Sequence, residues 1–295
     1  MNKKYRAYFD YNVFNAISNE NFEYKPSNNV DVFLSVSHVE EFYKAQCNDA
    51  DNNNHEKLEQ LKNLLVKIGK QGVILNPDTY RIIAKPERFA DCMERVMKYD
   101  TRKPVEENGA YLYNISKKTA NELIQKDKSV KNNSNLGAEE IWERDELKKN
   151  LSLFPSYYSG CSDIKEKFSK LSQYYNPSEL KSLSRKLIYP KEFVLEKNCF
   201  KTGYPSYAVL ECVIEFLNNI LVECGYNKDS DKRHAISGIH DCSHIIYATY
   251  ANCFFTLDKH LSKRAKAIYR YLGIPTMVVD TIEEYNGTIG EFNQN

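Results

Sequence analysis

Short apolar runs with strand-like spacing alternate with amphipathic segments in the first quarter of the chain. The run at residues 5–9 is followed by a helix candidate at 11–18, and the run at 30–36 leads into a second helical segment. Leucine and isoleucine recur at helical spacing between 58 and 68, before a short strand-like run at 73–75. The pattern predicts two strand–helix units and a third strand.

The alternation resumes after residue 205. We expect a long helix with one continuous apolar face, and then a helix that starts near Asp241. A buried strand at 254–255, a basic helix that ends at Gly273 and a last strand at 276–279 complete the series. Strand–helix–strand order with short connections predicts a mainly parallel sheet covered on both faces.

Residues 77–200 differ in character from both ends of the chain. They are rich in lysine and asparagine, and prolines interrupt a mostly helical pattern. We therefore expect a core made of residues 1–76 and 201–295, with residues 77–200 as a mostly helical insertion or lobe. The predicted fold class is α/β with a large helical insertion.

Composition and charge limit the ligands and the cellular compartment that we expect for this protein. Of 295 residues, 41 are Lys or Arg and 40 are Asp or Glu, so the net charge of 41 − 40 = +1 gives no global attraction for nucleic acid. The eight cysteines form no C-x-x-C pair, which favours free thiols in a reducing compartment. No apolar run approaches the ~20 residues of a membrane span, and no secretion signal is evident. We expect a cytoplasmic protein with no membrane contact.

Four acidic residues occupy positions where predicted strands end or the following helices begin: Asp10, Glu41, Asp241 and Asp258. In a parallel sheet such positions fall at one rim. Carboxylates within ~4–6 Å of one another raise each other's pKa unless a cation neutralises them. Mg²⁺ or Mn²⁺ would do so while keeping water ligands for catalysis, which favours metal-assisted phosphodiester hydrolysis. All four acids are thus candidate metal ligands and catalytic residues.

The surroundings of these acids resemble the motifs of PIN-domain nucleases. Phe9-Asp-Tyr-Asn-Val-Phe14 is similar to the family's opening motif, with Asn12 two residues after the aspartate. Leu34-Ser-Val-Ser-His-Val-Glu-Glu-Phe42 is similar to the second motif and places the family's acid on Glu41 rather than Glu40. Asp241-x-x-His244 and Phe255-Thr-Leu-Asp258 resemble the third and fourth motifs, with Thr256 two residues before the last acid.

The resemblance covers roughly residues 1–75 and 205–285. It implies a three-layer α/β/α sandwich and a Mg²⁺- or Mn²⁺-dependent endoribonuclease, with Asn12, Thr256 and His244 as supporting residues. The departure from the family is an insertion of more than a hundred residues between the second and third motifs. We expect Asp10→Asn and Asp241→Asn each to abolish cleavage and leave the fold intact.

A basic run follows the last acid and includes Lys259, Lys263 and Arg264. Such a run is usually a solvated helix face, but beside the proposed site it could contact phosphates of single-stranded or looped RNA. The helical insertion could serve a protein partner or inhibitor. The sequence also leaves open whether the protein forms a homo-oligomer.

Simpler or different readings exist for the same residues. Asp10 and Asp258 could be helix caps. Asp241, in the first turn of its helix, could simply gain from a favourable interaction with the helix dipole. Ser37 with Glu40 fits a capping box. Asp78, Glu211 and Glu215 are alternative acids, with Glu211 and Glu215 on one helix face.

Two other functions remain open on the sequence. The His240-Asp241 dipeptide is also found in HD-type metal-dependent nucleotide phosphohydrolases, which need an all-helical core and an upstream histidine, for which His38 and His55 are candidates. A non-catalytic PIN-like binding module is the third reading.

Overall fold

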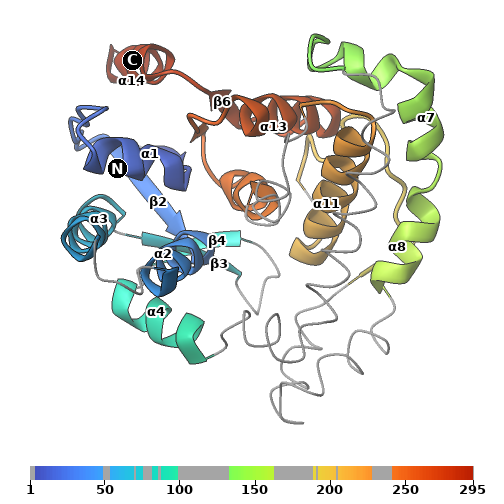
Figure 1. The fold of residues 1–295 in the computed structure, drawn as a ribbon. Helices are drawn as coiled ribbons and strands as arrows, with labels where there is room; N and C mark the ends of the chain where they lie inside the picture. The colour runs from blue at the N-terminus through green and yellow to red at the C-terminus, as the bar shows by residue number, and fades with distance from the viewer. Residues whose placement is uncertain are drawn as a thin grey trace.

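The computed structural model describes residues 4–48, 54–69, 71–75, 82–85, 88–98, 133–162, 189–190, 192–203, 205–227 and 241–294 (Figure 1). These residues form an α/β fold around one sheet. Its strands are β1 (Tyr5–Phe9), β2 (Val30–Ser35), β3 (Gln71–Leu75), β4 (Ile82–Lys85), β5 (Cys253–Phe255) and β6 (Met277–Val279).

The strand order is β4-β3-β2-β1-β5-β6. Strands β2, β1, β5 and β6 are all parallel, and β3 pairs with β2 in the same direction. Strand β4 pairs with β3 antiparallel. The predicted mainly parallel sheet is confirmed. The first strand of the chain lies in the middle of the sheet, so both of its long edges are paired.

Alternate side chains of the central strands enter two separate hydrophobic clusters. Tyr8 and Phe254 belong to the cluster on one face, and Phe9 and Phe255 belong to the cluster on the other. All four are fully buried, as expected for parallel strands covered on both sides.

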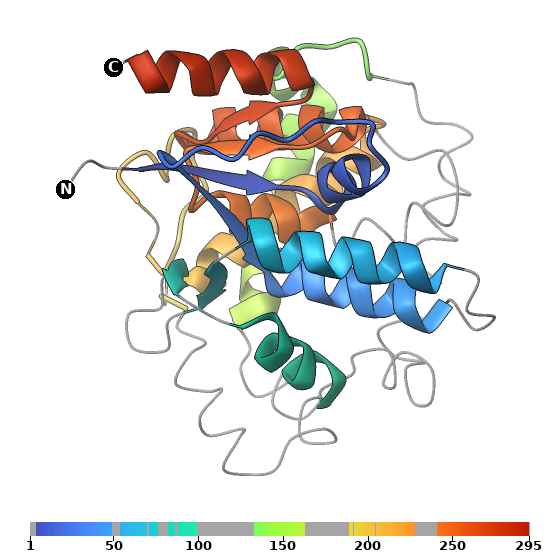
Figure 2. The ribbon, with the colours of Figure 1, turned by 90° about the vertical axis from the view of Figure 1, so that its left-hand side faces the viewer.

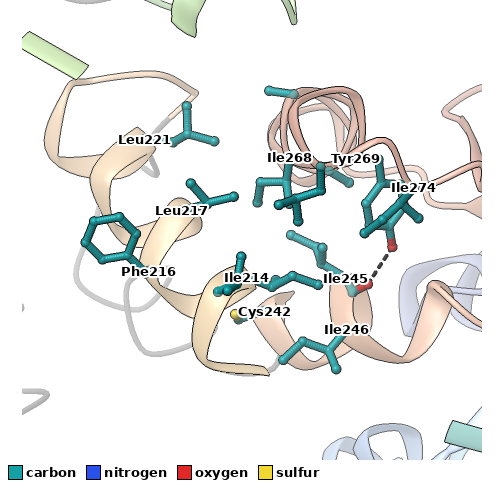
Figure 3. Packing of buried hydrophobic residues seen from close by; sticks show 14 of the residues in the cluster. Ile214, Phe216, Leu217, Leu221, Cys242, Ile245, Ile246, Ile268, Tyr269 and Ile274 are labelled. Atoms are coloured by element: carbon teal, nitrogen blue, oxygen red, sulfur yellow. Dashed lines mark hydrogen bonds between the residues drawn. The ribbon is translucent and has the colours of Figure 1, made fainter. Parts of the chain in front are cut away.

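Helices cover both faces, as Figure 2 shows. The Phe9 face packs against α1 (Tyr11–Ser18), α3 (His55–Ile68) and α14 (Ile282–Gln294). The Tyr8 face packs against α11 (Tyr207–Glu223), α13 (Lys259–Leu272) and a helix at residues 241–248. The last three helices interlock through Leu217, Ile245 and Ile268 (Figure 3). At the side of the molecule, α2 (Val36–Asn48) packs against α4 (Phe89–Lys98) through a third cluster.

A helical middle region joins the Tyr8-side core. Its described elements are a 3-10 helix, η1 (Glu140–Glu143), and the helices α7 (Asp145–Leu151) and α8 (Phe154–Ser162). The indole of Trp142 donates a hydrogen bond to the carbonyl oxygen of Ala267 on α13. The middle region therefore shares a core with the C-terminal helices. The sheet itself extends beyond residue 76, because β4 pairs with β3.

The predicted capping box at Ser37 and Glu40 is wrong. Helix α2 begins at Val36, so Ser37 lies inside its first turn. The backbone N–H of Ser35 instead donates to Nδ1 of His38 over 3.0 Å. A side chain at the third helical position that reaches back to the cap residue is the capping-box arrangement, here with histidine in place of glutamate and shifted by two residues.

Two predictions from composition can also be compared with the structure. The cysteines carry no disulfide, and Cys212, Cys224 and Cys253 are buried as expected. Within the described ranges, none of the helices combines the length and the apolar character that crossing a bilayer requires.

Candidate functional site

The sheet reverses its winding between β1 and β5. From β1 the chain proceeds to β2 and β3 on one side, whereas β5 and β6 lie on the other. In open α/β sheets, ligands bind at the carboxyl ends of the strands where such a reversal occurs. The residues that follow the two central strands here are Asp10 and Thr256.

Asp10 is buried at this point and caps helix α1. Its Oδ1 accepts the backbone N–H of Tyr11 over 2.7 Å, so the cap reading is confirmed. Its Oδ2 accepts hydrogen bonds from the Thr256 hydroxyl over 2.8 Å and from the Asn12 amide over 3.3 Å. Burial raises the pKa of Asp10, and the nearby charge of Glu41 raises it further. Capping does not exclude a second role, since Oδ2 faces the end of β5.

His244 joins Asp10 to Glu41. Its Nε2 lies 2.8 Å from Oε2 of Glu41 and 3.6 Å from Oδ1 of Asp10. Burial opposes the charged ring, but the charges of Glu41, then Asp10 and Asp241, outweigh it and raise the pKa of His244 to about 9. A buried imidazolium therefore lies against the two acids and balances part of their negative charge. The three predicted supporting residues Asn12, Thr256 and His244 all contact Asp10.

A chain of buried hydrogen bonds continues from the other side of His244. Its Nδ1 lies 2.8 Å from the Tyr8 hydroxyl, which lies 2.6 Å from Oγ of Ser35. Ser35 contacts Nδ1 of His38 through its backbone N–H and, over 3.3 Å, through Oγ. Nε2 of His38 meets the carbonyl oxygen of Phe9 over 2.6 Å. The chain thus returns to the residue that precedes Asp10.

Sequence reasoning did not assign this role to Tyr8, Ser35 or His38. Burial, then the charge of His244, lowers the pKa of His38 to about 3, so the ring is neutral. The Ser-x-x-His spacing at the junction of a strand and a helix was the available signal, because it places the histidine where it can cap the helix.

The other two predicted ligands have different partners. Oδ2 of Asp241 accepts a hydrogen bond from the Arg264 guanidinium over 2.9 Å, with 14% and 2% of the two side chains exposed. Oδ1 of Asp258 accepts the backbone N–H groups of His260 and Leu261 and caps helix α13. The structure therefore gathers Asp10 and Glu41 around His244 and gives Asp241 and Asp258 partners of their own.

An unused polar group lies beside the gathered pair. The Tyr11 hydroxyl is buried and has no hydrogen-bond partner among the described residues. Burial raises the pKa of Tyr11, and the charge of Glu41 raises it further, so the two groups interact. Across the ranges that the structure describes, no cluster of three or more His, Cys, Asp and Glu side chains is arranged to hold an ion.

The basic residues of α13 divide into buried and exposed ones. Arg264 is 1% exposed, so it faces Asp241 in the interior rather than the surface. Lys259 and Lys263 are exposed, and Nζ of Lys263 contacts the carbonyl oxygen of Ser134. Lys266 is paired with Asp280. Lys259 and Lys263 therefore offer exposed positive charge to a phosphate at the start of this helix.

The remaining candidates contribute less. His240 and Asp78 lie outside the described residues. The sheet does not fit the all-helical core of the HD-type alternative, and His55 is exposed at the start of α3. Glu211 and Glu215 lie on α11, and their charges reach Cys242, which adjoins Asp241.

Comparison of the chain with protein-family models, with curated proteins and with solved structures gives no match.

Proposed function

We propose that this protein is a metal-dependent endoribonuclease whose site lies at the reversal of the sheet. The observation that carries the proposal is the meeting of Asp10 and Glu41 around Nε2 of His244 at the carboxyl end of β1. The single charge of protonated His244 balances only one of the two carboxylates, and Mg²⁺ and Mn²⁺ bind such oxygen ligands. The four PIN-like motifs, in order along the chain, support the same reading.

The residues present fit an ion in part. Asp10 and Glu41 would hold it, and the buried Tyr11 hydroxyl beside Glu41 could donate to a water or a substrate oxygen. Asp241 and Asp258 complete the proposed set of four acids. Their observed bonds use Oδ2 and Oδ1 respectively, so each carboxylate would serve both its present partner and the ion.

When bound, the ion would supply an activated water and neutralise charge on a scissile phosphate. The protein contributes the rest. Thr256 and Asn12 fix Oδ2 of Asp10 by hydrogen bonds, and His244 keeps Glu41 near Asp10. Lys259 and Lys263 offer exposed positive charge on the helix that follows β5, where an RNA phosphate would bind in a salt-dependent way. Helices on both faces of the sheet suit the three-layer PIN-like arrangement.

The test is cleavage of labelled RNA and DNA by the full chain with Mn²⁺, Mg²⁺ or chelator. We expect RNA cleavage that chelator abolishes and that Asp10→Asn lowers by about 100-fold or more. Asp31→Asn is the matched control, because Asp31 lies near the amino end of β2 and pairs with Lys4 at the surface. Cleavage that survives chelator, or equal activity in both variants, would contradict the proposal.

A non-catalytic PIN-like module is the second candidate. It is favoured by one observation, namely that protonated His244 already balances part of the charge of Asp10 and Glu41. Titration calorimetry with Mn²⁺ separates the two. Heat of binding that Asp10→Asn removes supports the nuclease, and absence of binding together with absence of cleavage supports the module.

A further inference from the structure

The protonation of His38 follows from its two partners. Nδ1 receives the backbone N–H of Ser35, so this nitrogen carries no hydrogen. Nε2 meets the carbonyl oxygen of Phe9, which only accepts, so Nε2 carries the hydrogen. His38 is therefore fixed as the neutral ring with hydrogen on Nε2.

This assignment sets the direction of each hydrogen bond in the run that leads from His38 through Ser35 and Tyr8 to His244. Because Nδ1 of His38 only accepts, its contact with Oγ of Ser35 requires the serine hydroxyl to donate. Oγ of Ser35 then accepts from the Tyr8 hydroxyl, whose single hydrogen is used there. The Tyr8 oxygen in turn accepts from Nδ1 of His244. The opposite direction would set lone pairs of Ser35 and His38 against each other.

We infer that Tyr8, Ser35 and His38 are positioning residues that hold His244 by its Nδ1–H, so that Nε2 is the nitrogen presented to Asp10 and Glu41. This chain of hydrogen bonds anchors the ring to strands β1 and β2 and to the start of α2, from which its members come. All of its side chains are buried, so water does not compete for these bonds. Partners of this kind fix the orientation of a site histidine.

The spectroscopic test needs no activity. With ¹⁵N-labelled histidine in the full chain, we expect His38 to carry hydrogen only on Nε2 and His244 to show a protected Nδ1–H. Tyr8→Phe should remove the protection of the His244 Nδ1–H and leave the His38 signal in place. Tyr285→Phe, which deletes a hydroxyl from a buried ring beside Phe255, should leave both signals unchanged.

Ser35→Ala provides a second variant, because it interrupts the chain without touching His244. It should shift the His244 signal in the same direction as Tyr8→Phe. An unprotonated Nδ1 on His244 in the wild-type protein, or a His244 signal that neither variant changes, would overturn the inference.

The kinetic test rests on the proposed function. Tyr8→Phe should lower kcat for RNA cleavage by about 10-fold to 100-fold, with KM changed by less than about twofold, and Tyr285→Phe should change neither. Equal kcat in wild type and Tyr8→Phe would refute the positioning role. Absence of cleavage by the wild-type protein would refute the proposed nuclease instead, and the spectra would still test the hydrogen-bond chain.

Discussion

The hydroxyl of Thr256 donates a hydrogen bond to Oδ2 of Asp10 over 2.8 Å and joins two residues 246 positions apart in the chain. Oγ1 of Thr256 in turn accepts the backbone N–H of Asp258 over 3.1 Å. One hydroxyl therefore couples the acid after β1 to the last acid of the candidate site. A threonine two residues before an acid is thus a geometric requirement here, because it lets the end of β5 reach the end of β1.

Thr256→Val should impair activity more than stability. The variant keeps the shape of the side chain but leaves Oδ2 of Asp10 without this donor, which we expect to cost about 1–2 kcal/mol of unfolding free energy. RNA cleavage should fall about tenfold or more. Thr276→Val is the control. Thr276 precedes β6, at the amino end of the parallel strands and away from the end that carries Thr256, and its hydroxyl donates to the carbonyl oxygen of Ala251. Similar losses of activity in both variants at similar stability would argue against a role for Thr256 at the site.

Asp241→Asn should destabilise the fold, contrary to the expectation from sequence. It would remove the negative charge that Asp241 places against the buried guanidinium of Arg264, at a cost of about 3–5 kcal/mol. Urea unfolding measures this change. The exposed pair of Lys4 and Asp31 supplies the comparison, since Asp31→Asn should cost under about 1 kcal/mol. Addition of Arg264→Met to Asp241→Asn should recover stability, and failure to do so would mean that the two side chains are not coupled.

Two substitutions at Asp258 separate its capping role from a role in catalysis. Asp258→Ser retains an oxygen that can accept the N–H groups of the first turn of α13, whereas Asp258→Ala loses the cap and about 1 kcal/mol of stability. If Asp258 binds the ion, both variants lose cleavage, and only the alanine variant loses stability. Full activity in Asp258→Ser at normal stability would show that the residue is a cap alone.

Stability should fall as pH rises through the range in which His244 loses its proton. The folded-state pKa of about 9 exceeds the ordinary value of 6.5, so the contribution is fully present below about pH 6.5 and is lost as pH passes 9. The rise of the pKa from 6.5 to about 9 corresponds to a contribution on the order of a few kcal/mol. Urea unfolding at about pH 6 and about pH 9 measures it.

Glu41→Gln is the matched variant for this pH dependence. The charge of Glu41 is the largest effect that raises the pKa of His244, so the decline in stability between the two pH values should shrink when that charge is removed. An unchanged decline in Glu41→Gln would assign it to other groups.

Local sequence patterns predict many of the strands and helices that surround the candidate site. The strand before Asp10 and the helix after it were found at their observed bounds, since apolar spacing and the cap both point to that junction. Gly273 ends α13 in the left-handed conformation, as its position suggested. Asn12, Thr256 and His244, the three expected supporting residues, each contact Asp10, and their roles at the site remain predictions.

The partners of charged side chains could not be predicted in this way. Arg264 lies in a basic run that reads as a solvated face, yet the helix turns it inward to Asp241, a residue 23 positions away. The role of His38 in α2 depends on the carbonyl oxygen of Phe9, which lies 29 positions away on strand β1. Both contacts arise from tertiary packing, which the spacing of residues along the sequence does not predict.

The central place of β1 has a consequence for synthesis of the chain. The pairing of Phe9 with Phe255 requires a strand that the ribosome makes 246 residues later. At about 5–20 residues per second, roughly 12–50 s separate the two events. Until then β2 can cover one edge of β1 while the other stays open in the nascent chain. The ionisable cluster around Asp10 is therefore assembled only after residues 241–256 have been made.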